Sequence, residues 1–157
     1  MSDKFISQVV TSFEIGNRIL LKRSYKYRRS TGQFLTPPSL ARFMARQLGA
    51  IRTGFRLLDP AIGSGTLVCA VIERLISEGK PLEILIDGYE IDSELCEVAK
   101  EILSEATERA AQYGIVVRAL VQQSDFILDG IYDVLPIWEM DAKKSAYQLI
   151  IANPPYF

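Results

Sequence analysis

The chain of 157 residues contains no histidine and only two cysteines, Cys69 and Cys96. The absence of histidine excludes every mechanism that needs a histidine base. The two cysteines fall inside predicted helices and have no CxxC spacing, so the sequence supports neither a disulfide framework nor a zinc site. We therefore expect no metal centre.

Long apolar runs are also missing. No stretch approaches the roughly 20 residues that span a bilayer, and the start of the chain, MSDKFISQVV, lacks the cationic and apolar blocks of a signal peptide. We therefore expect a cytoplasmic protein that does not act at a membrane. A composition of 48% apolar and 24% charged residues is typical of a globular domain with a buried core.

Negative charge is scarce at the front of the chain. Residues 1–56 contain 11 Lys or Arg but only Asp3 and Glu14, whereas the remainder has 7 basic and 17 acidic residues. The front segment is thus near +9 and the body near −10. Either the front contacts a polyanion or it docks on the acidic body of the same chain, and charge alone does not decide between them.

The front segment is predicted to be helical. Residues 3–28 place apolar side chains among polar ones in a pattern typical of a broken amphipathic helix, at Phe5, Val9, Phe13, Ile19 and Leu20. A basic and aromatic cluster follows at 22–29, where cations suit phosphates while tyrosines stack or pack. We expect residues 1–30 to form a basic helical arm.

A second helix is predicted to begin with Thr36 as its N-cap and Pro37 as its first helical residue, and to stop at Gly49. Its apolar side chains fall on one stripe, formed by Leu40, Phe43, Met44 and Leu48.

From residue 55 short apolar runs alternate with long helical stretches, which is typical of a parallel sheet with crossover helices. Strands are predicted at 55–58, 84–89, 115–121 and 147–152. Helices are predicted at 66–78 and from the N-cap Asp92 to Gly114, while residues 127–146 support no assignment. The pattern predicts an α/β fold with a doubly wound parallel sheet.

The turn DPAIGSG joins the first predicted strand to its helix. Gly63 and Gly65 let backbone N–H groups approach a ligand at a helix N-terminus, as in nucleotide sites. Asp59 would repel a pyrophosphate but attract an ammonium or sulfonium group, which favours S-adenosylmethionine (SAM) over NAD. The alternative is an ordinary tight turn after a strand.

Acidic residues also end the next two strands. Glu90 stands where a carboxylate usually holds ribose hydroxyls. Asp125 is placed to accept from an adenine amino group while Phe126 covers the ring, although Asp125 equally suits a plain turn.

The first and fourth strands of a doubly wound sheet are neighbours at the switch point, so DPAIGSG and Asn153–Tyr156 are predicted to face one cleft. Pro154 and Pro155 cannot donate to a ladder and must end the strand, leaving free carbonyl acceptors. Asn153 adds a side-chain carbonyl and Tyr156 a flat ring. A bare Asn-Pro-Pro would usually be a structural turn.

Together these motifs resemble those of the SAM-dependent amino-group DNA methyltransferases, and more narrowly the adenine-N6 enzymes in which the SAM motif precedes NPPY. The resemblance covers about residues 31–157 and is carried by TGQFLTP, DPAIGSGT, GYEID, SDF and IIANPPYF. NPPY is shared with enzymes that methylate protein glutamine or RNA guanine, but GQFLTP before DPAxGSG points to restriction-modification and related defence systems. Ile62 replaces a cysteine or threonine common in such enzymes.

The resemblance implies a Rossmann-like methyltransferase fold and a role for each motif residue. Thr36 and Pro37 would close over the methionine end of SAM, whose amino acid part would lie among Asp59, Ala61, Gly63 and Gly65. Glu90 would hold the ribose, and Asp125 with Phe126 the adenine. Asn153 and Pro154, followed by Pro155, would grip the amino group of a flipped adenine, with Tyr156 stacked on its ring.

Residues 31–157 would then be the cofactor-binding part of a catalytic domain that has four of about seven expected strands. We expect the chain alone to be inactive, to self-associate or to need the remaining domain and a target-recognition region, with duplex DNA as its partner. Two alternatives stay open. One is a methyltransferase for RNA or protein glutamine, and the other is a non-catalytic SAM-binding or DNA-binding module.

Overall fold

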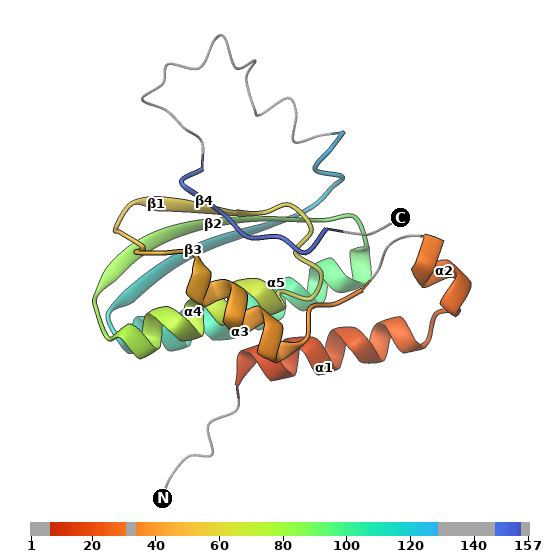
Figure 1. The fold of residues 1–157 in the computed structure, drawn as a ribbon, viewed down its shortest axis with the longest axis horizontal. Helices are drawn as coiled ribbons and strands as arrows, with labels where there is room; N and C mark the ends of the chain where they lie inside the picture. The colour runs from red at the N-terminus through yellow and green to blue at the C-terminus, as the bar shows by residue number, and fades with distance from the viewer. Residues whose placement is uncertain (1–6, 31–33, 129–146, 155–157) are drawn as a thin grey trace, which may run out of the picture.

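The computed structural model describes residues 7–30, 34–128 and 147–154 of the chain (Figure 1). The elements follow the order α1 (Gln8–Leu21), α2 (Tyr25–Ser30), α3 (Pro38–Gln47), β1 (Phe55–Asp59), α4 (Thr66–Glu78), β2 (Leu82–Glu90), α5 (Ser93–Ala111), β3 (Ile115–Gln123) and β4 (Leu149–Ile150). Of the stretch 127–146 that the sequence leaves unassigned, residues 129–146 lie outside the described residues.

The four strands form one parallel sheet in the order β3-β2-β1-β4. β1 pairs with β2 from Phe55 opposite Ile84 to Asp59 opposite Gly88, and with β4 through Leu57 opposite Leu149. The predicted adjacency of the first and fourth strands is therefore confirmed. The carboxyl ends of β1, β2 and β4 reach the same edge of the sheet.

The helices α1, α3, α4 and α5 lie on one side of the sheet (Figure 1). The core between them is made of aliphatic side chains with almost no exposure, including Leu57, Val68, Leu75, Ile84 and Ile86. Burial of each such side chain stabilises the fold by about 1.5–3 kcal/mol relative to an exposed one.

The caps of α4 and α5 are set by local sequence. α4 is bounded by Gly65 (φ 91°) and Gly79 (φ 64°), two left-handed positions that glycine adopts without strain. α5 begins after Asp92, whose Oδ1 accepts from Glu94 N and Leu95 N at 3.1 Å each. The predicted limits of α4 and the predicted N-cap of α5 are confirmed.

The start of α3 differs from the prediction. Pro37, not Thr36, is the N-cap residue, and the helix begins at Pro38. A residue that precedes proline is pushed out of the α region, so Pro37 is extended (ψ 146°). Thr36 is instead buried, with 5% of its surface exposed.

The predicted apolar stripe of α3 is also wrong in part. Leu40 and Phe43 are 43% and 54% exposed, whereas Ala41 and Ala45 are fully buried. Small alanine side chains allow α3 to approach α4 closely, and the large residues beside them face outward.

The broken helix predicted over 3–28 consists of α1 and α2, and the break lies at 22–24. Residues 3–6 of that prediction lie outside the described residues. The fourth strand is shorter than the predicted 147–152, because only Leu149 and Ile150 pair with β1. Within the described ranges, no helix has both the length and the apolar character needed to cross a membrane.

Candidate active site

The turn that follows β1 is tied to the end of β2 by backbone hydrogen bonds. Ile62 N donates to Tyr89 O and Gly63 N donates to Glu90 Oε2, both at 2.9 Å. Gly63 has φ 58°, a conformation that side chains rarely adopt. Gly88 on β2 makes room for the turn, because a Cβ there would lie 2.5 Å from Ile62 Cδ1.

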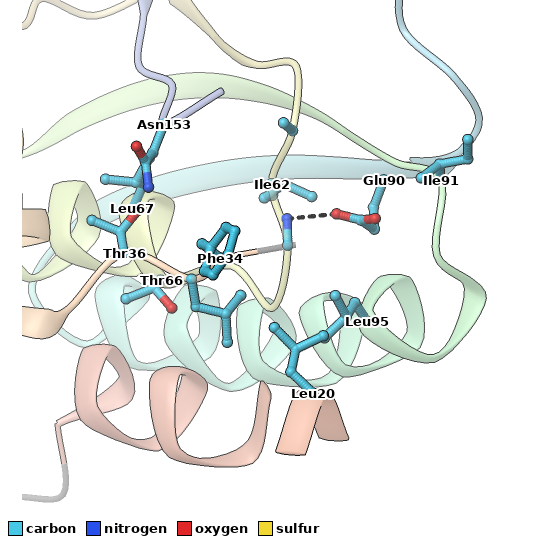
Figure 2. A pocket seen from close by; sticks show the side chains of 13 residues that line it. Leu20, Phe34, Thr36, Ile62, Thr66, Leu67, Glu90, Ile91, Leu95 and Asn153 are labelled. Atoms are coloured by element: carbon cyan, nitrogen blue, oxygen red, sulfur yellow. Dashed lines mark hydrogen bonds between the residues drawn. The ribbon is translucent and has the colours of Figure 1, made fainter. Parts of the chain in front are cut away.

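A pocket opens between this turn, the ends of β2 and β4, and α1 (Figure 2). Its polar lining includes Thr36, Thr66, Glu90 and Asn153, and its apolar lining includes Leu20, Ile62, Leu67 and Leu95. Gly63 and Asn153 line the same cavity, although 90 residues separate them in the sequence. The predicted meeting of the two motifs at one opening is thus present.

A second pocket shares Glu90 with the first. Its lining includes Pro60, Tyr89, Asp125, Phe126 and Pro154. Ala61, Glu90 and Ile91 line both pockets, which are therefore neighbouring compartments of one cleft. Phe126 meets the Tyr89 ring edge to face, with centroids 5.0 Å apart.

Glu90 connects the turn to the start of α5. Its Oε2 accepts from Gly63 N at 2.9 Å and its Oε1 accepts from Asp92 N at 2.8 Å. Burial raises the pKa of Glu90, while these backbone hydrogen bonds oppose that shift. The carboxylate has four lone pairs in all, so it can accept a further hydrogen bond from a ligand.

Asp59 lies beneath the turn and is fully buried. Its Oδ1 accepts from Ala61 N at 3.2 Å, whereas its Oδ2 has no hydrogen-bond partner in the parts of the chain that the structure describes. Burial, followed by the nearby charge of Glu90, raises the pKa of Asp59 to about 7. A cation bound close to this carboxyl would favour its ionised form.

The predicted site residues divide into three groups. Those that line the cleft are Thr36, Ala61, Gly63, Glu90, Asp125, Phe126, Asn153 and Pro154. Three do not line it, because Pro37 is exposed, Asp59 lies under the turn and Gly65 is the N-cap of α4. Pro155 and Tyr156 lie outside the described residues.

Asp125 also acts as a turn residue, which is the alternative role considered for it from the sequence. Its Oδ1 accepts from Ile127 N at 2.8 Å, which stabilises the turn after β3. The carboxylate therefore shapes the turn and lines the second pocket at the same time.

Sequence reasoning missed the apolar wall of the first pocket. Leu20 comes from α1, Leu95 from α5, and Phe34 and Leu35 from the segment before α3. At helical spacing, Leu20 and Leu95 look like ordinary core residues, and they do belong to a small buried cluster with Ile19. No local signal distinguishes such a residue from a pocket wall.

The basic front of the chain docks in part on its own acidic body. Three arginines pair with body carboxylates: Arg23 with Asp92 and with Glu94 (3.2 Å), Arg42 with Glu73 (3.5 Å), and Arg56 with Asp87 (2.6 Å). In the described ranges the exposed Lys22 and Lys26 form no ion pair. The polyanion contact therefore stays a prediction for these lysines.

No metal centre emerges from the described residues, because no three His, Cys, Asp or Glu side chains gather in a suitable group. Cys69 and Cys96 are free and buried. Burial raises the pKa of both thiols, which keeps them protonated at neutral pH.

Comparison with known proteins identifies relatives over nearly the whole chain. The sequence model of the N-6 DNA Methylase family matches residues 17–157. The type II methyltransferase M.BsuBI of Bacillus subtilis is 33% identical over 145 residues, which are 89% of this chain and 27% of that protein. M.AccI of Acinetobacter calcoaceticus is 28% identical over 134 residues, 85% of this chain and 20% of that protein.

Two solved structures share the fold. One, from Vibrio vulnificus, is described as a modification subunit of a type I restriction enzyme (TM-score 0.59, 22% identity, 98% of this chain and 30% of that one). The other, from Listeria monocytogenes, is described as a class I SAM-dependent methyltransferase (TM-score 0.52, 17% identity, 96% of this chain and 40% of that one). The predicted Rossmann-like fold is confirmed. The chain spans about a quarter of the length of the curated relatives it matches.

Proposed function

Because the chain belongs to the N-6 DNA methylase family, we propose that it forms the cofactor-binding part of an adenine-specific DNA methyltransferase of restriction-modification type. The observation that carries this proposal is the shared pocket of Gly63 and Asn153. A methyl donor seated on the turn and an amino group held by Asn153 would be adjacent there. The two restriction-modification relatives named as type II methyltransferases support the assignment.

The residues of the cleft fit SAM, which supplies an activated methyl group when bound. The cofactor is cationic, and Asp59 and Glu90 place two carboxyl groups at the turn. The orphaned Oδ2 of Asp59 is a buried acceptor that a cationic group nearby would compensate. Around the amino acid part we place Thr36, Ala61 and Gly63, which line the pocket, while Pro37 and Gly65 would act by shaping the backbone beside them.

The two compartments suit the two ends of the cofactor. Glu90, which lines both, would accept from ribose hydroxyls with its remaining lone pairs. Phe126 and Asp125 line the second pocket and offer a ring face and a carboxylate acceptor to the adenine. The apolar side chains Leu20 and Leu95 exclude water from the first pocket.

Asn153 and Pro154 are the proposed catalytic residues. An exocyclic adenine nitrogen is a poor nucleophile while its lone pair is delocalised into the ring. If the Asn153 side-chain oxygen and the Pro154 carbonyl both accept from this amino group, they favour a pyramidal nitrogen with an available lone pair. No histidine base and no cysteine nucleophile is needed. Pro155 would stiffen this turn and Tyr156 would stack on the extruded base.

The proposed partner is duplex DNA. In the sequence, the segment 22–30 lies between two residues that line the pocket, Leu20 on α1 and Phe34 before α3. Its lysines Lys22 and Lys26 are exposed and would contact phosphates beside the cleft. Replacing both by alanine should reduce the magnitude of the slope of log K for DNA binding against log salt concentration by about 2. Replacing the exposed Arg46 and Arg52 on and after α3 provides the control, and equal effects of the two pairs would contradict a specific contact.

The experiment that tests the function has two steps. SAM is first titrated calorimetrically into the complete protein and into Glu90→Ala, with Glu97→Ala, a change at an exposed carboxylate on α5, as the control. We expect only Glu90→Ala to abolish binding. Methyl transfer is then compared among duplex DNA, tRNA and glutamine peptides. Transfer to RNA or peptide, or SAM binding without any transfer, would overturn the adenine-specific assignment in favour of the two alternatives.

The isolated chain of 157 residues should bind SAM weakly and transfer no methyl group, since it spans about a quarter of the length of its relatives. Clear turnover by this chain alone would contradict that expectation.

A further inference from the structure

A cluster of buried hydroxyl groups joins α1 to the back of the cofactor turn. Ser12, Ser64 and Thr66 are exposed by only 0%, 0% and 3%. The Ser12 hydroxyl lies 2.7 Å from Ser64 O, 2.9 Å from Thr66 Oγ1 and 3.2 Å from Ser64 Oγ. A serine on the first helix is thus in hydrogen-bond contact with residues 52 and 54 positions further along the chain.

The chemistry of these groups assigns the donors. A carbonyl oxygen only accepts, so Ser12 must donate its single proton to Ser64 O. Its lone pairs are then free to accept from the Thr66 hydroxyl. Ser12 therefore satisfies a buried backbone carbonyl that has no access to water, and such a carbonyl is costly to leave unpaired.

Ser64 is the residue of this turn that α1 contacts and fixes. Gly63 and Gly65 on either side have φ 58° and 91°, and neither has a side chain that packing could fix. Gly63 is held by Glu90 on the β2 side. Ser12 holds Ser64 on the opposite side, so the two anchors fix the turn between them.

Gly16, one helical turn after Ser12, brings α1 against the same residue. A Cβ at position 16 would lie 2.5 Å from Ser64 Oγ and 2.7 Å from Ser64 Cβ. Only glycine permits this approach, since distances below 3.0 Å force atoms to move.

α1 is itself held at both ends. Before its first turn Ser7 donates to Glu73 of α4 at 2.6 Å, and after its last turn Arg23 pairs with Asp92, the N-cap of α5. Val9 on α1 belongs to the main core and is fully buried. The helix is therefore a rigid support for the turn rather than a loosely attached arm.

We propose that Ser12 and Gly16 are positioning residues for the cofactor turn, and that α1 is an integral part of the cofactor site. Both residues precede position 17, where the match to the family begins. The proposal rests on the proposed function, because the turn is taken to seat SAM. Neither residue lines the pocket itself. Ser12 acts through Ser64 and the pocket residue Thr66. Gly16 acts through Ser64 and the pocket residue Leu35, whose Cδ1 would lie 2.7 Å from a Cβ at position 16.

Ser12→Ala in the complete protein is the first test, with Thr11→Ala as the matched control. Thr11 is the neighbouring residue, and its hydroxyl bonds within α1 to Ser7 O at 3.1 Å. We expect Ser12→Ala to raise the Kd and the KM for SAM by about tenfold. The kcat at saturating SAM and the KM for DNA should stay within about twofold, and Thr11→Ala should change none of these values.

Val9→Ala separates positioning from stability. It removes buried core volume from the same helix without touching the turn, so it should lower the melting temperature at least as much as Ser12→Ala. Its Kd for SAM should nevertheless remain that of the wild type. If SAM affinity falls in proportion to melting temperature across both variants, α1 contributes stability alone and the proposal is wrong.

Hydrogen exchange of the SAM-free protein gives a second readout. Ser12→Ala should speed exchange at the amides of residues 63–67, and Val9→Ala should not do so selectively. Gly16→Ala, compared with Asn17→Ala, should also weaken SAM binding and speed exchange at these amides, by displacing Ser64 and the pocket residue Leu35. If the wild type binds SAM but both Ser12→Ala and Gly16→Ala leave SAM affinity and hydrogen exchange unchanged, the positioning proposal is wrong. The proposed function would still stand in that case. A wild-type protein that does not bind SAM would instead remove the proposed function itself.

Discussion

The two sides of the cleft are supported very differently. The turn between β1 and α4 is fixed on two sides. Its amides Ile62 N and Gly63 N donate to Tyr89 O and Glu90 Oε2 at the end of β2, and its carbonyl Ser64 O accepts from Ser12 on α1. Asn153, in contrast, follows the two-residue strand β4, which within the described residues pairs only with β1. The cofactor side is thus held by contacts from two different elements, β2 and α1, whereas the target side is held through the pairing of β4 with β1. Substitutions on the two sides should therefore change different quantities.

The largest effect is expected on the target side. Asn153→Ala should lower kcat by about 100-fold or more, because it removes an acceptor for the target amino group. The Kd for SAM should change by less than about threefold, since the other lining residues of the pocket are retained. Parallel methyl-transfer assays and calorimetry check this separation.

Asn153→Asp sharpens the same test. It keeps a side-chain oxygen at the same position and should retain more activity than Asn153→Ala. Equal activities of the two variants would mean that the Asn153 oxygen does not accept from the substrate.

The next effect concerns the conformation of the turn. Gly63→Ala and Gly49→Ala both place a side chain at positive φ, 58° and 68°, and each should cost about 1–2 kcal/mol of unfolding free energy. Only the Cβ of Gly63→Ala approaches a neighbour, Leu35 Cδ2 at 3.0 Å, at the pocket wall. SAM affinity should fall for Gly63→Ala alone. Equal affinity of both variants would show that the turn geometry does not govern binding.

A pH-dependent effect should separate stability from function at Asp59. Its folded pKa, about 7, lies above its ordinary value of 3.8, so the folded state holds a proton that the unfolded state has lost between these pH values. The unfolding free energy of the SAM-free wild type should therefore fall as pH rises from about 4 to about 7, and Asp59→Asn should lack this contribution.

Denaturant titrations from pH 4 to pH 8 measure this contribution. SAM binding by Asp59→Asn should be weaker than that of the wild type, and the difference should grow as pH rises through about 7, where the Asp59 carboxyl ionises. A variant whose stability falls with pH as steeply as the wild type would contradict the burial of an ionisable Asp59 carboxyl.

The smallest effect is expected from ion pairs. Arg23→Gln breaks the partly buried pair with Asp92 and should lower the unfolding free energy by about 1 kcal/mol. Arg118→Gln breaks the pair with Glu83, whose side chains are 69% and 41% exposed, and should cost less than about 0.5 kcal/mol. Chemical denaturation of both variants compares the loss of unfolding free energy at the Arg23 pair, beside the cleft, with that at the Arg118 pair on β3. A larger loss for Arg118→Gln would reverse the expected order.

Local patterns were sufficient for much of the fold. The limits of α4 depend on Gly65 and Gly79, and the start of α5 depends on Asp92, all of which act within one helical turn. The alternation of apolar runs with helices predicted the parallel sheet, and chain connectivity predicted β1 beside β4. The same reasoning failed at Thr36, where steric pressure from Pro38 on Pro37 outweighed the capping preference of threonine.

Contacts between distant residues were decided only when the chain packed. Nothing near Ser12 or Gly16 in the sequence indicates that they meet Ser64, and nothing near Asp59 indicates that one of its oxygens would be buried without a partner. Side-chain chemistry at short range therefore specifies caps, turns and the choice of motif. Which helix supports the turn, and which carboxyl loses its water, depend on how closely the elements approach, and that is a property of the whole packed core.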